Sequence, residues 1–75
     1  MKFDSIDQIK TYNWAGNHYS DANAFRAIHN FAVDQSNSTA DRAEALRQML
    51  DNGMGCGRDD EYNDEDLVSG YIAAE

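Results

Sequence analysis

Apolar residues recur at spacings of three and four in several short stretches of this chain, which is the periodicity of amphipathic helices. The clearest stripes are Ala24, Phe25, Ile28, Phe31 and Ala32, followed by Ala43, Leu46, Met49 and Leu50. No stretch alternates apolar and polar residues with β-branched enrichment, as a strand would. We therefore predict an all-α fold: a small bundle of about four short helices, with a glycine-rich loop before the last.

Capping residues indicate where the first two helices begin and end. Ser5 and Gln8 have the spacing of a capping box, in which the hydroxyl and the amide each satisfy a free backbone N–H. Gly16 and Asn17 predict a left-handed end to this helix. Ser20 is expected to cap the second helix, which continues to about Val33.

The third helix is expected to begin at Ser38 or Thr39 and to end at Asn52-Gly53 in a left-handed turn, with Arg42 and Arg47 on its outer face. Glycines in 53–58 predict a loop. Asn63 should cap a last helix over about 64–73. Its apolar stripe, Leu67, Val68, Tyr71 and Ile72, should dock it onto the core.

Length and cysteine content bound the class of protein. Seventy-five residues make one domain with one small core, over 1–75, which leaves little room for a deep substrate pocket. Cys56 is the only cysteine, so no intramolecular disulfide forms, and a reducing cytoplasm is the expected location. No signal peptide and no membrane span are expected, because no apolar run has the necessary length.

The negative charge is concentrated at one end of the chain. Residues 1–58 hold seven acids and six bases, whereas 59–75 hold seven acids and no base, within a net charge of −8. Direct binding to nucleic acid or to anionic lipid is disfavoured, since phosphates would be repelled. Without a base in this segment we expect its carboxylates to be unpaired and to form a directional acidic face.

Metal binding and catalysis are not expected. Counted from Asp59, an EF-hand loop would need glycine at Asp64 and glutamate at Gly70, so the calcium pattern fails. His18, His29 and Cys56 match no zinc spacing, and His29 is expected at the edge of the core. The glycines at 53–57 lack the strand, lysine and helix of a phosphate-binding loop. We expect no cofactor and no enzyme activity.

Two other surfaces are alternatives to the acidic face. Tyr12, Trp14 and Tyr19 supply aromatic groups for a protein–protein adaptor or regulatory subunit, although so small a domain needs aromatic residues first in its core. The second and third helices also have the spacing of a helix-turn-helix, with Arg42 and Arg47 available to a DNA groove. The overall negative charge argues against that alternative.

The acidic block between Asp59 and Asp66, the short length, the single cysteine and the helical content give the chain a resemblance in character to small acidic phage-encoded inhibitors. These are the anti-CRISPR and DNA-mimic antirestriction proteins. The resemblance shares no motif, so it transfers no residue roles. It implies a non-catalytic inhibitor that binds the positively charged nucleic-acid-binding surface of a bacterial CRISPR or restriction complex and blocks target DNA. The expected contact residues are Asp59, Asp60, Glu61, Tyr62, Asp64, Glu65 and Asp66.

Overall fold

The computed structural model describes residues 1–14 and 22–74, and every regular element in these ranges is helical. The elements are α1 (Ile6–Lys10), α2 (Ala22–Val33), α3 (Thr39–Gln48), a π-helical turn η1 (Met49–Gly53) and α4 (Asp64–Ala74). The predicted small all-α bundle is confirmed. The expected helix ends at Gly16, Asn17 and Ser20 lie outside the described residues.

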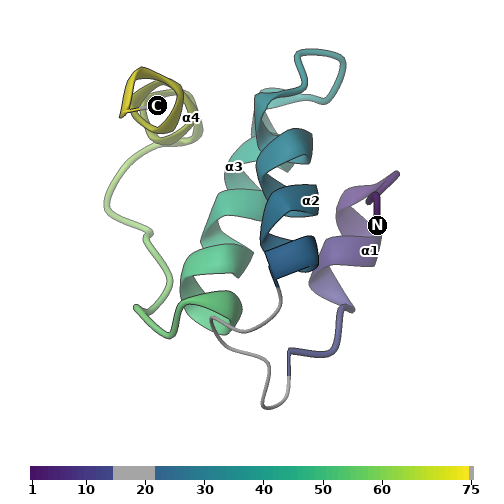
Figure 1. Ribbon diagram of the computed structural model, residues 1–75. Helices are drawn as coiled ribbons and strands as arrows, with labels where there is room; N and C mark the ends of the chain where they lie inside the picture. Colours follow the sequence, from purple (N-terminus) through teal and green to yellow (C-terminus); the bar gives the residue numbers. More distant parts are fainter. Residues whose placement is uncertain (15–21, 75) are drawn as a thin grey trace.

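Helix α3 is the central element, because it packs against α1, α2 and α4. Figure 1 shows α2 and α3 side by side, with α4 set beyond α3 at the end of an extended segment. The largest fully buried side chains are Ile9 of α1, Ile28 of α2 and Leu46 of α3, so three helices meet in one core. Helix α4 adds only Val68 to the buried set.

The capping predictions have mixed outcomes. The Ser38 hydroxyl accepts a hydrogen bond from the backbone N–H of Asp41, and the Asn63 side chain accepts one from the N–H of Asp66. The Ser5 hydroxyl makes no such bond, so the expected capping box is wrong. Gln8 accepts instead from the N–H of Asp4, one residue before the cap.

The third helix does not end in a left-handed turn at Gly53. It continues into η1, and the left-handed residues are Gly55 and Gly57, with φ of 67° and 85°. Gly53 is closely packed, because a Cβ there would lie 3.0 Å from Phe25 Cε1 and 3.2 Å from the Trp14 ring. This contact would force neighbouring side chains to shift.

Candidate functional site

The acidic segment is fastened to the core by Arg47, which the sequence had placed on the outer face of its helix. Its side chain is only 10% exposed. Nε donates to the backbone carbonyl of Asp59 at 2.7 Å, and Nη2 donates to that of Tyr62 at 3.0 Å. Nη1 donates to Asp64 Oδ1 at 2.7 Å. One guanidinium group therefore fixes both the course of the segment and the start of α4.

Arg42 is also buried, although it too was predicted on the outer face of its helix. Its Nε donates to the carbonyl of Ala32 at 2.7 Å, near the end of α2. Last-turn carbonyls have no partner within the helix, so this bond satisfies one of them. Because Arg42 and Arg47 are both buried in internal hydrogen bonds, neither extends into solvent as the helix-turn-helix alternative requires.

A second arginine crosses from the glycine-rich loop to α3. Arg58 donates to both carboxylate oxygens of Glu44, at 2.8 and 2.5 Å, and to Asp60 Oδ1 at 2.9 Å. The hydrogen bonds from Arg58 lower the pKa of Glu44 to about 2. The same contacts raise the pKa of Arg58 above its usual value. The loop is thereby held against the outer side of α3.

The expectation of unpaired carboxylates is thus wrong for part of the block. Asp64 and Asp60 form ion pairs, the latter with Arg58 and, at 3.8 Å, with Arg47. Asp59 accepts from the backbone N–H of Glu61 through its side chain. Local spacing does not predict the Arg47 contacts, because Arg47 lies twelve or more residues before the block, whereas Arg58 directly precedes the block and pairs with Asp60 two residues on.

Four carboxylates and one aromatic ring of the block lie on the surface. Asp60, Glu61, Glu65 and Asp66 are exposed, Asp60 while paired with Arg58, and Tyr62 is 55% exposed. With Glu44, which shares Arg58, this surface holds seven carboxylates and two arginines and therefore keeps a net charge of −5. The predicted site residues therefore lie together. Asp60 and Asp64 form ion pairs with Arg58 and Arg47, whereas Glu61, Glu65 and Asp66 are exposed and form no ion pair with another described residue.

An apolar groove borders this acidic surface, and the sequence reasoning missed it. It has a volume of about 480 Å³ and lies between the α3–η1 segment and α4. Its apolar lining includes Leu46, Met49, Leu50, Met54, Leu67 and Tyr71, and its polar lining is Asp59, Tyr62 and Asp66. The sequence predicts Leu50, Leu67 and Tyr71 in the core. Only the structure shows that they are half-buried, and this incomplete burial is what reveals the groove.

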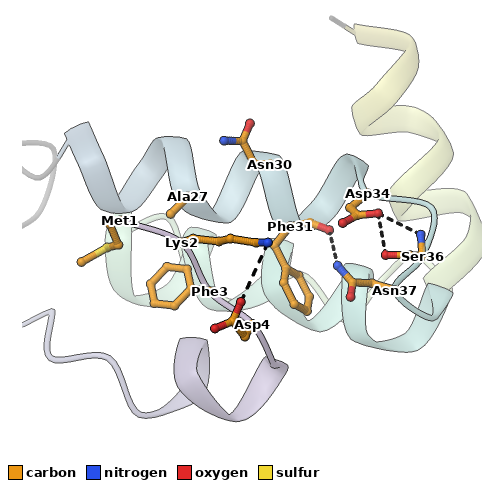
Figure 2. Close-up of a pocket in the computed structure, with 10 residues that line it drawn as sticks. All are labelled: Met1, Lys2, Phe3, Asp4, Ala27, Asn30, Phe31, Asp34, Ser36 and Asn37. Atoms are coloured by element: carbon orange, nitrogen blue, oxygen red, sulfur yellow. Dashed lines mark hydrogen bonds and ion pairs between the residues drawn. The ribbon is translucent and has the colours of Figure 1, made fainter.

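A different hollow, of about 350 Å³, lies between the N-terminal segment and α2 (Figure 2). Part of its polar lining is engaged locally: Asp34 accepts from the N–H and hydroxyl of Ser36, and Asn37 donates to the Phe31 carbonyl. The Ser36 hydroxyl lowers the pKa of Asp34.

The aromatic cluster of the adaptor alternative is largely internal. Trp14 is 6% exposed, and its ring centroid lies 4.7 Å from that of Tyr12 and 5.7 Å from that of Phe25. Tyr19 and His18 lie outside the described residues. His29 is half-buried, as expected at the core edge, and its Nδ1 lies 2.7 Å from the Tyr71 hydroxyl.

Comparison with protein-family models, curated proteins and solved structures found no match. Among the described residues, no group of three or more His, Cys, Asp or Glu side chains is placed to hold a metal ion. No described helix is long and apolar enough to cross a membrane.

Proposed function

We propose that this chain is a non-catalytic inhibitor that binds a basic, nucleic-acid-binding surface of another protein through its acidic segment. The observation that carries the proposal is the fastening of this segment by Arg47, with Glu61, Glu65 and Asp66 left exposed. A fixed set of charges loses less conformational entropy on binding than a free tail does. Opposite charge also accelerates association.

The partner class follows from charge and from the resemblance noted in the sequence. DNA presents one negative charge per ~1.7 Å of duplex, so proteins that bind it carry basic grooves. A folded surface with exposed carboxylates and Tyr62 can occupy such a groove in place of DNA. Bacterial CRISPR effectors and restriction complexes are therefore the first candidate partners.

The test is inhibition of DNA binding by purified effector and restriction complexes, measured by mobility shift. The charge variant is Glu61→Gln, Glu65→Gln and Asp66→Asn, which leaves the Arg47 and Arg58 ion pairs intact. The matched control neutralises three exposed acids elsewhere, Asp4, Asp7 and Asp51. We expect inhibition that weakens with salt, is lost in the first variant and is kept in the control.

Asp60 and Asp64 are unsuitable for this test, because their replacement would also remove internal ion pairs. Equal inhibition by the native chain and the charge variant would contradict the proposal. So would inhibition that is unchanged between about 50 and about 500 mM salt, since exposed charges are screened over this range.

A further inference from the structure

The acidic surface and the apolar groove beside it share residues, so they form one continuous surface. Asp59, Tyr62 and Asp66 belong to the acidic block and also line the groove. Glu65 is exposed next to Asp66, in the first turn of α4. A partner that contacts these carboxylates therefore also meets the groove between α3 and α4.

The groove is an unfilled packing position between helices. Helix α4 buries only Val68, while Leu67 and Tyr71 on the same helix stay half-buried. Gly70 also lines the groove, and a Cβ built on it would meet no atom within 4 Å. The space between α3 and α4 thus has room for side chains that this part of the chain does not provide.

Two methionines contribute to the apolar lining of the groove. Met49 and Met54 line it and also line an adjoining hollow of about 690 Å³ beside α2. Unbranched thioether side chains adapt to apolar ligands of different shape, which makes such surfaces suited to receiving helices.

Charge selects among the possible occupants. The described residues that line the groove include Asp59 and Asp66 and no lysine or arginine. A second copy of this chain would bring the same net charge of −8, and nucleic acid or anionic lipid would also be repelled. An occupant with an apolar stripe flanked by basic residues would pack against the apolar lining of the groove and pair with Asp59 and Asp66.

We propose that the groove between α3 and α4 binds a basic amphipathic helix of the partner protein. The apolar stripe of that helix would contact Met49, Met54 and Leu67, and its lysines or arginines would lie over Asp59 and Asp66. Arg26 lines the adjoining hollow, so the basic residues belong at the acidic end. This inference rests on the proposed function, to which it adds the secondary structure and chemistry of the bound segment.

The experiment uses a model helix, an amphipathic leucine–lysine peptide of about 18 residues. Two control peptides accompany it: one with the same composition in scrambled order, and one with glutamine in place of leucine. Binding to the full chain is measured by fluorescence anisotropy of labelled peptide. We expect the amphipathic peptide to bind at least about tenfold more tightly than either control.

Substitution of Gly70 tests the location directly. Gly70→Trp and Gly70→Leu place a side chain in the groove and should each weaken peptide binding by about tenfold or more. Gly70→Ala adds only a methyl group and should change binding by less than about twofold. Thermal melting by circular dichroism identifies any variant that fails to fold. If one of the two bulky variants does not fold, the other still tests the groove.

The outcomes separate this inference from the proposed function. If the glutamine peptide binds as tightly as the amphipathic one, the groove inference is overturned, whereas binding through the acidic surface stands. If peptide binding survives both bulky substitutions in a folded chain, the inference is also overturned. If the amphipathic peptide binds but ignores salt and the Glu61, Glu65 and Asp66 variant, the groove does not select basic residues and the inference is overturned, whereas the inhibition assay still decides the proposed function.

Discussion

At the scale of single residues, the placement of the acidic segment depends on one buried guanidinium group. Arg47 makes three hydrogen bonds to residues twelve to seventeen positions later in the chain. No local spacing encodes such contacts. On a helix an arginine is by default a solvated residue, and only a loop folded back over it makes burial favourable.

Replacing Arg47 by methionine keeps the aliphatic stem and removes all three donors. Two backbone carbonyls and the Asp64 carboxylate then lose their partner, which should lower the free energy of unfolding by about 2–4 kcal/mol. Urea unfolding followed by circular dichroism measures this. The control is Arg26→Met at an exposed site, expected within about 0.5 kcal/mol of native.

Glu44 should make stability depend on acid pH. Its folded pKa of about 2 lies below the ordinary 4.5, so the unfolded chain takes up the proton first as pH falls. The Glu44 contribution is therefore complete above about pH 4.5 and lost as pH approaches 2. The urea midpoints of the native and Glu44→Gln chains should therefore differ at pH 6 and converge near pH 2, because protonation of Glu44 removes its contribution to stability. A constant difference across this range would contradict the assignment.

At the scale of elements, the sequence was informative where a boundary depends on its own residues. The Asn63 cap and the helix expected over 64–73 were predicted closely, because a cap acts within a few residues of itself. The π-helical continuation through Gly53 was missed. Gly53, its last residue, lies against Phe25 and Trp14, and local spacing does not predict these contacts.

The two serine positions provide a matched pair of cap substitutions. Ser38→Ala removes the bond to the Asp41 N–H and should destabilise the chain by about 1 kcal/mol. Ser5→Ala removes no cap bond and should cost only a few tenths of a kcal/mol. Equal losses of melting temperature in the two variants would refute the difference in capping.

At the scale of the whole molecule, stability should be unequal between the core and α4. Helices α1, α2 and α3 supply nine of the thirteen buried apolar residues that the structure describes and Phe3, Trp14 and Met49 supply three more, whereas α4 supplies only Val68. Regions with few buried contacts open at lower free energy than the core. The fold class was predictable from periodicity. The weak attachment of α4 was not, because its predicted apolar stripe includes Ile72, which is 40% exposed in the structure.

Native-state hydrogen exchange should show this division. Amides of α4 should exchange faster than those of α2 and α3, and Arg47→Met should accelerate α4 further with a smaller effect on α2. A neutral substitution such as Arg26→Met serves as the reference. Uniform protection across all helices would show that α4 opens only with the core.

The burial of Trp14 makes its fluorescence a reporter of the core. It is the only tryptophan in the chain, and its indole ring contacts Tyr12 and Phe25 and lies against Gly53. None of these neighbours belongs to α4. Intrinsic fluorescence therefore reports on the core, while helical ellipticity reports on all helices together. A chain whose ellipticity falls before its emission shifts to the red has released its last helix from an otherwise intact domain.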